Sequence, residues 1–162
     1  MTRTTAALLA AALAFGLAIA PAGAPRAQAA RPTLSVAILP MPGDDAIADE
    51  AARQVWPLVA AVAARLAVGT AVTVTSNDAV VNAVGDDPSA VDAAQELNVR
   101  YVLMGDVSND NGLYRFHCQL RDGRNGAIVW AQVMVTDDFN ITTFPHEIAL
   151  TLVRVMREVA GA

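Results

Sequence analysis

The sequence predicts a single α/β domain of the α+β kind, with a mixed sheet of about five strands and helices packed mainly on one face. Short apolar runs alternate with helical patterns in the first half of the chain. Three strand-like runs then follow one another between residues 99 and 135, and a last helical pattern ends the chain. Alternation followed by consecutive strands is typical of a mixed sheet with helices packed on it. The predicted order is β-α-β-α-β-β-β-α.

The first strand and the first helix are predicted from residues 35–66. Residues 35–40 (SVAILP) are apolar on both sides of the run, as in a central strand that is covered on both faces. Residues 46–66 carry apolar side chains at helical spacing, after a loop in which Asp44 or Asp45 can cap the helix. Pro57 lies inside this pattern, so we expect a kink or a break near residues 54–56.

A second strand and two short helices are expected next. Residues 71–76 (AVTVTS) are rich in β-branched side chains, which favour a strand. The first short helix is expected to be capped within residues 76–78 and to stop at Gly85. The second is expected to use Asp87 as its cap and Pro88 as its first helical residue.

A three-strand meander is predicted from residues 99–135. In residues 113–121 apolar and polar side chains alternate, which indicates a strand with one dry and one wet or partly covered face. The connecting turns, residues 109–112 (NDNG) and 122–126 (DGRNG), are rich in residues that tolerate positive φ. A final helix is expected from residue 142 onward, with an apolar stripe at Ile148, Leu152, Val155, Met156 and Val159.

Residues 1–29 have the pattern of a cleaved secretory signal peptide. Arg3 precedes an apolar run at residues 6–20, Pro21 ends that run, and residues 27–29 (AQA) offer small side chains for cleavage after Ala29. The apolar run is shorter than the roughly 20 residues of a comfortable membrane span. We therefore expect a periplasmic or secreted domain at residues 30–162, without stable membrane insertion; retention of the signal as an anchor is the alternative.

The charge of the chain excludes some classes of partner. The net charge is −5, and residues 30–162 hold nine arginines and all 16 acidic residues, a net charge of −7. Nucleic acids and anionic lipid headgroups require a basic surface, so neither is an expected partner. Cys118 is the only cysteine of the sequence, so no intramolecular disulfide forms.

Four segments in order resemble the TolB amino-terminal-like domain of bacterial proteins. They are residues 35–40 (SVAILP), 97–107 (LNVRYVLMGDV), 119–122 (QLRD) and 126–130 (GAIVW). The resemblance covers residues 33–160 and implies a mixed α/β domain that occurs in envelope proteins and beside cyclase and regulator domains. It implies no established catalytic residues. The chain departs from the pattern at Pro57 and in the loop after residue 40, which lacks the usual aromatic side chain and Asn.

The candidate recognition surface is the polar side of the strand at residues 113–121, formed by Arg115, His117, Gln119 and Arg121. Arginine suits carboxylate or phosphate groups, so this stripe could hold a peptide or an anionic ligand; a plain solvated sheet face is the alternative. His117 and Cys118 are neighbours on a strand and project to opposite faces, so they cannot bind one metal ion. We expect Cys118, Trp56 and Trp130 to belong to the core.

The sequence contains no catalytic motif and no calcium loop, so we expect a non-catalytic module of the envelope without a cofactor. Its partner is expected to be an envelope protein, or else a small ligand, bound through the face or the edge of the sheet. Two alternatives stay open. One is a small hydrolase that combines Asp86, Asp106 or Asp138 with His117 or His146, and the other is a calcium-binding domain with paired aspartates.

Overall fold

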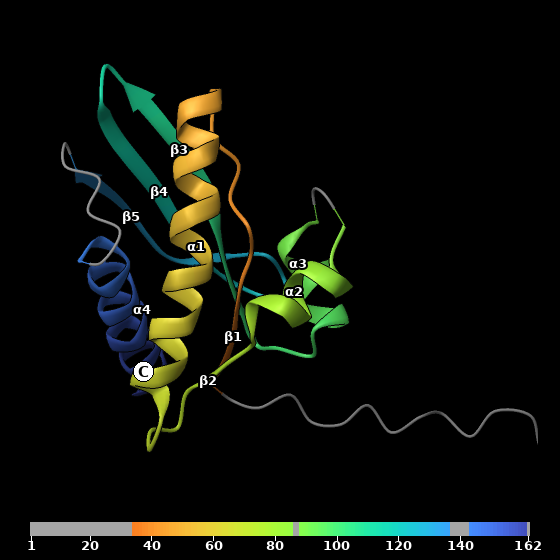
Figure 1. Ribbon diagram of the computed structural model, residues 1–162. Helices are drawn as coiled ribbons and strands as arrows, with labels where there is room; N and C mark the ends of the chain where they lie inside the picture. Colours follow the sequence, from red (N-terminus) through yellow and green to blue (C-terminus); the bar gives the residue numbers. More distant parts are fainter. Residues whose placement is uncertain (1–33, 86–87, 137–142, 162) are drawn as a thin grey trace, which may run out of the picture.

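The computed structural model describes residues 34–85, 88–136 and 143–161. Its sheet has five strands in the order β2-β1-β3-β4-β5 (Figure 1). The elements in chain order are β1 (Ser35–Ile38), α1 (Ala46–Ala67), β2 (Thr73–Val74), α2 (Asn77–Ala83), α3 (Ala90–Glu96), β3 (Tyr101–Asp110), β4 (Leu113–Asp122), β5 (Ile128–Thr136) and α4 (Phe144–Gly161). The first three strands of the sheet are parallel, and β3, β4 and β5 form the predicted antiparallel meander.

The direction of each crossover explains the placement of the helices. The chain moves from β1 through α1 to β2 on one side, and then returns through α2 and α3 past β1 to β3. Crossovers between parallel strands are right-handed, so two crossovers in opposite directions place their helices on opposite faces. The two long helices, α1 and α4, pack side by side on one face (Figure 1). The short α2 and α3 cover only part of the other face, near β1 and the start of β3.

The main core lies between the sheet and the two long helices. Three aromatic rings meet in its centre: Phe116 contacts Trp56 edge-on with a centroid distance of 5.7 Å and Phe144 at 4.6 Å. Such pairs add about 1 kcal/mol each beyond the area that they bury. Trp130 is partly buried against this core, so the expected structural role of both tryptophans is confirmed. A second, smaller core packs Ala37, Leu39 and Val102 under α2 and α3.

Two details of the helices differ from the sequence-based expectation. α1 continues without a break through Pro57, whose side chain lies on the exposed side of the helix. Water can satisfy the carbonyl group that Pro57 leaves without its helical donor on this side. The second short helix is capped by Ser89 and not by Asp87, because the Ser89 hydroxyl accepts the main-chain N–H of Asp92. Asp87 itself lies outside the described residues.

The turns of the meander have the predicted conformation. Asn111 and Gly112 have φ values of 51° and 88° in the tight β3–β4 turn, and Gly126 has a φ of 73° in the β4–β5 turn. Positive φ at both central residues matches the right-handed twist of the flanking strands. The β4–β5 pairing shifts register between Leu120 and Arg121, which marks a β-bulge opposite residues 128–130.

The segment after β1 runs on beside β3. Main-chain hydrogen bonds join Leu39 to Leu103 and Pro42 to Val107, each with an N–O distance of 2.9 Å. Residues 39–44 therefore cover the side of β3 that β1 leaves open, which gives the projecting β3–β4 hairpin a neighbour on this side. None of the described helices is long and apolar enough to cross a membrane.

Candidate functional site

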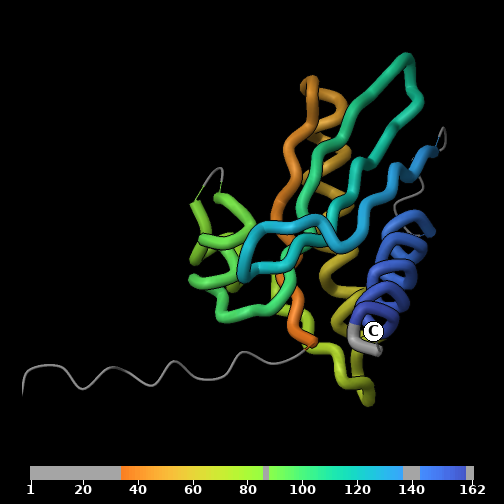
Figure 2. The backbone as a smooth tube through the Cα atoms, turned by 180° about the vertical axis from the view of Figure 1, so that it is seen from behind, coloured from red at the N-terminus to blue at the C-terminus, as the bar shows by residue number. Residues whose placement is uncertain are grey.

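The predicted polar stripe of β4 lies on the face of the sheet opposite α1 and α4. Phe116, Cys118 and Leu120 point into the main core, so Arg115, His117, Gln119 and Arg121 point away from it. Their cross-strand neighbours on β3 are, in the same order, Ser108, Asp106, Met104 and Val102. Figure 2 shows this side of the molecule: α2 and α3 gather at one border of the sheet, and the meander extends beyond them. The stripe is half-buried.

Hydrogen bonds hold the two arginines differently. The Gln119 side-chain oxygen accepts two bonds from Arg121, at 2.7 Å from Nη2 and 3.2 Å from Nε. This neutral partner orients the Arg121 guanidinium, which forms no ion pair with any residue that the structure describes. Arg115 makes one ion pair, in which Nη1 lies 3.6 Å from the carboxylate of Asp110. Both groups of that pair are in contact with water, so the pair contributes at most about 1 kcal/mol.

β5 adds apolar side chains beside the polar stripe. Val133 lies opposite His117, and Val135 lies opposite Arg115. Their exposed fractions are 50% and 51%, which is unusual for valines on a strand that pairs in register. A shallow depression of about 200 Å³ lies over residues 117–119 of β4 and 131–133 of β5. The surface thus combines cationic heads on β4 with uncovered aliphatic groups on β5.

The open face of the meander carries charges of both signs. Along the paired registers of β3 and β4, this face carries the guanidinium groups of Arg115 and Arg121 and the carboxylates of Asp106 and Asp110, and Asp110 is already paired with Arg115. Arg121 forms no ion pair with any of the described residues, so its guanidinium can bind a carboxylate or phosphate group without breaking an existing pair.

Cys118 lies directly behind this surface and takes no chemical part in it. Its side chain is buried, as expected, among Phe116 and Leu120. Burial, and to a smaller extent the negative charge of Asp106, raise the pKa of the Cys118 thiol to about 12. A thiol that stays protonated at neutral pH is neither a nucleophile nor a good metal ligand.

The acidic residues that could support a hydrolase or a calcium site have separate structural partners. Asp45 caps α1 by accepting the main-chain N–H groups of Ile47 and Ala48, and Asp44 accepts the N–H of Asn109. Among the described residues no group of three or more His, Cys, Asp or Glu side chains is placed to hold a metal ion. Asp86, Asp87, Asp137 and Asp138 lie outside the described residues.

The two histidines are not brought together. His117 lies on the open face of the sheet, whereas His146 is exposed on α4, which packs on the opposite face. Of the hydrolase candidates that the structure describes, Asp106 and His117 are neighbours, because they pair across β3 and β4. On β5 the residue opposite His117 is Val133, which supplies neither a base nor a nucleophile.

Sequence reasoning identified β5 as a strand but missed the exposed valines on it. A strand that is apolar on both alternate faces resembles a central, fully covered strand. The only signal for an edge position was its place as the last strand of the meander, followed by a helix. The sequence of α4 did not indicate a binding surface on its exposed side, because charged residues are ordinary on a surface helix.

Comparisons with known proteins give the fold and no sequence family. No protein-family model matches the sequence, and no curated protein matches it. The crystal structure of TolB from Acinetobacter baumannii superposes on 77% of this chain with a TM-score of 0.54 and 18% identity, and the match spans 28% of the TolB chain. The PelC dodecamer from Paraburkholderia phytofirmans matches 78% of this chain and 89% of its own, with a TM-score of 0.48 and 17% identity.

Lipoprotein GNA1162 from Neisseria meningitidis gives a match of the same kind. It covers 79% of this chain and 97% of its own, with a TM-score of 0.48 and 16% identity. Identities this low speak for the backbone arrangement and not for shared residues or activity. The resemblance to the TolB amino-terminal-like domain is therefore confirmed as a likeness of fold.

Proposed function

We propose that this protein is a non-catalytic binding module of the cell envelope, which holds an acidic, extended segment of a partner protein on its open sheet face. The observation that supports the proposal best is the combination on β4 and β5. Arg115 and Arg121 stand beside Val133 and Val135 on the face of the sheet opposite α1 and α4, and α3 contacts this face of the meander only at the end near Arg121. Arginine heads suit carboxylates, and the valines suit alternate aliphatic side chains of an extended chain.

The spacing along β4 favours an extended segment over a single small anion. The two arginines are six residues apart on one strand, which corresponds to about 20 Å. One carboxylate or phosphate cannot contact both guanidinium groups across that distance. A peptide in β conformation with carboxylates near both ends and aliphatic groups between them fits the whole stripe.

The envelope location is supported by the signal-like residues 1–29. A domain of residues 30–162 exported in this way works outside the cytoplasm. Its single cysteine, Cys118, is buried and free, so the domain folds without an internal disulfide. The acidic composition of the domain is compatible with a protein partner and unfavourable for nucleic acid.

Amide chemical-shift mapping of the exported protein tests the proposal, with a synthetic peptide that alternates Glu and Val as the probe. The expected perturbations concentrate on β4 and β5. Arg115→Glu combined with Arg121→Glu should weaken binding at least tenfold, since each charge-assisted contact is worth about 1.5 kcal/mol or more. Arg65→Glu is the matched control: Arg65 is exposed at the end of α1, on the other side of the sheet, and carries the same charge.

The result that overturns the proposal is binding that spreads over α1 or α4, or binding that Arg65→Glu weakens as much as the double variant does. The same pair of variants then serves in the native setting. Crosslinking in the envelope should recover a partner with wild type and with Arg65→Glu, and lose the same partner with the Arg115/Arg121 double variant.

A further inference from the structure

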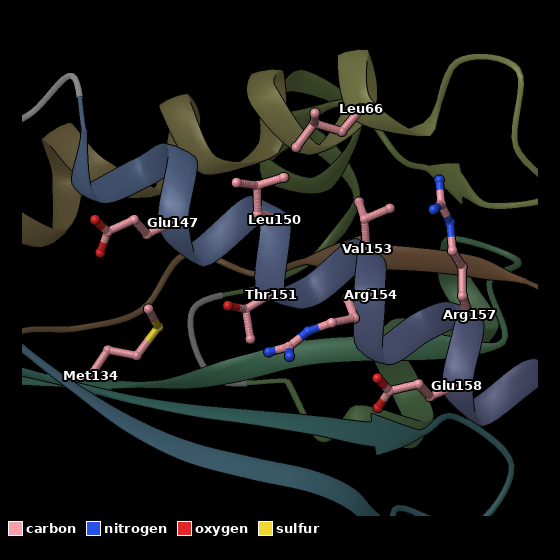
Figure 3. A pocket seen from close by; sticks show the side chains of 9 residues that line it. All are labelled: Leu66, Met134, Glu147, Leu150, Thr151, Val153, Arg154, Arg157 and Glu158. Carbon is pink, nitrogen blue, oxygen red and sulfur yellow. The ribbon is translucent and has the colours of Figure 1, made fainter.

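One border of the molecule combines an open strand with an open helix flank. β5 is the last strand of the sheet, and no described strand pairs with its outer edge. α4 lies next to it on the covered face, and a groove of about 740 Å³ follows α4. Figure 3 shows Thr151, Arg154 and Glu158 on the flank of α4 toward Met134 of β5, and Leu150 and Val153 on the flank toward Leu66.

The sequence of β5 lacks the usual protection of an edge strand. Residues 128–136 (IVWAQVMVT) contain no charged residue and no proline. Ile128, Val129, Val133 and Val135 are 52%, 38%, 50% and 51% exposed. Monomeric proteins keep long edges from pairing with charges, prolines or very short strands, and β5, with nine residues, has none of these. Such a strand is typical of an edge that pairs with another chain.

The exposed side of α4 carries charges of both signs that have no partner of their own. Within the described part of the chain, Glu147, Arg154, Arg157 and Glu158 form no ion pair. Leu150 is 46% exposed between them. The acidic Glu147 lies in the first turn of α4, and both arginines lie in its second half.

We propose that a second copy of this chain covers this border, with β5 pairing antiparallel to β5 of the copy and α4 lying beside α4 of the copy. The occupant must present a strand next to β5 and a helix next to α4 at the same layer spacing. A single extended peptide would cover the strand and leave the groove along α4 open. A second copy presents this same border, and two-fold symmetry turns it to face the first.

The charges agree with this arrangement. Two-fold symmetry runs the two α4 helices in opposite directions, so Glu147 of one copy approaches the arginine-bearing half of the other. Each such contact occurs twice in the dimer. In this pairing, odd-numbered residues of β5 lie opposite odd-numbered residues of β5 in the copy, on the same face of the joined sheet. The exposed Val133 and Val135 therefore contact apolar side chains of the copy. Stable interfaces bury roughly 1,200–2,000 Å² of surface. A contact that combines strand pairing with helix packing reaches this area more readily than strand pairing alone.

Light scattering coupled to gel filtration tests the proposal on the protein as its host exports it. The expected mass is that of a dimer. Val133→Lys combined with Val135→Lys should give a monomer, because both positions are solvated in one copy and oppose apolar residues in the dimer. Glu147→Arg should weaken the dimer at least tenfold, and adding Arg154→Glu should restore it, because the two signs are then exchanged in both copies. Unfolding curves like that of wild type establish that the variants are folded.

A cysteine scan gives an independent measurement, because the native Cys118 is buried. Single cysteines at Ala131, Gln132 and Val133 should be joined between copies by a short bis-maleimide. Val81→Cys, on α2 and 57% exposed, is the matched control and should give no dimer. A monomer at all concentrations, an assembly larger than two, or crosslinks as strong at residue 81 as on β5 would overturn the proposal. Arg115→Glu with Arg121→Glu should stay dimeric, so the dimer and the peptide site fail independently.

Discussion

Asp122 joins the end of β4 to the start of β3 through Arg100, whose Nη2 donates a hydrogen bond to Oδ2 of Asp122 at 3.0 Å. Arg124 adds a second guanidinium contact at 2.9 Å and donates its main-chain N–H to Oδ1, also at 2.9 Å. The Arg100 guanidinium also lies 5.2 Å from the centroid of the Tyr101 ring. The Asp122 side chain is only 8% exposed, so the carboxylate depends on these partners for its solvation.

The stability of the fold should therefore depend on pH through Asp122. Hydrogen bonds from the Arg124 side chain, with help from its main-chain N–H and from the charge of Arg100, hold the pKa of Asp122 below its ordinary value of 3.8, against the opposing effect of burial. Because the pKa is lower in the folded state, the stabilisation is complete well above pH 3.8 and is lost as the pH falls through the folded pKa.

Asp122→Asn should lower the free energy of unfolding by about 2 kcal/mol at neutral pH, and the difference from wild type should shrink in acid. Urea unfolding across the acid range measures both effects. Asp110→Asn is the control, because Asp110 is 64% exposed in its own ion pair, and its effect should be slight. A difference for Asp122→Asn that does not change with pH contradicts the assignment.

Gly105→Ala should be strongly destabilising. Gly105 pairs with Cys118 in the middle of the β3–β4 ladder, and a Cβ at this position would overlap the main-chain oxygen of His117. Main chain cannot yield as a flexible side chain can, so we expect a loss of about 3 kcal/mol. Thermal unfolding measures it against Gly85→Ala, where a Cβ meets no atom within 4 Å. Equal melting temperatures for the two variants would show that the strands separate to accommodate the methyl group.

Cys118 should not react with thiol reagents while the protein is folded. Its pKa of about 12 leaves almost no thiolate at neutral pH, and its side chain is buried. Labelling with an aromatic disulfide should be at least about a hundredfold slower than for a free thiol, and should become fast in denaturant. Labelling of the folded protein at the rate of the unfolded chain would be the contrary result.

Pro57→Ala should stabilise the protein. Pro57 is exposed in the interior of α1 and cannot donate to the carbonyl group one turn earlier. Alanine restores this hydrogen bond and favours the helix, with a gain of up to about 3 kcal/mol. A rise in the melting temperature is the expected reading. A fall would mean that packing of α1 on the sheet depends on the geometry that the proline imposes.

Export should remove residues 1–29. The exported protein should begin at Ala30, as measured by its intact mass and by sequencing from its N-terminus. Ala27→Lys combined with Ala29→Lys should block cleavage, because both positions require small side chains. Arg31→Gln, which lies after the site, should be processed as wild type. A chain in the envelope that still begins with Met1 would show that the segment is retained as an anchor.

The sequence predicted the elements whose signal is local. The two turns of the meander were predictable because Asn111, Gly112 and Gly126 adopt the positive φ that their residue types favour. The stripe at Arg115 and Arg121 followed from strict alternation along β4.

What the sequence could not predict depends on the position of an element in space. Both Asp87 and Ser89 are good caps, and tertiary packing decides between them. Pro57 breaks an isolated helix, yet α1 is held by the core on its buried side and continues. The exposed valines of β5 have the same pattern as a central strand, and only the order of strands in the sheet shows that no described strand pairs with the second edge of β5.

The two borders of the sheet are unequal, and this limits how the protein can polymerise. At one border β2 has only two residues, so it offers almost no template for another strand. At the other border β5 has nine. Residues 39–44 also cover the flank of β3, so β5 has the one long unpaired edge among the described strands. A second copy that pairs with β5 occupies this edge. Association through this edge therefore ends at a closed pair, whereas a sheet with two long edges could extend into a fibre.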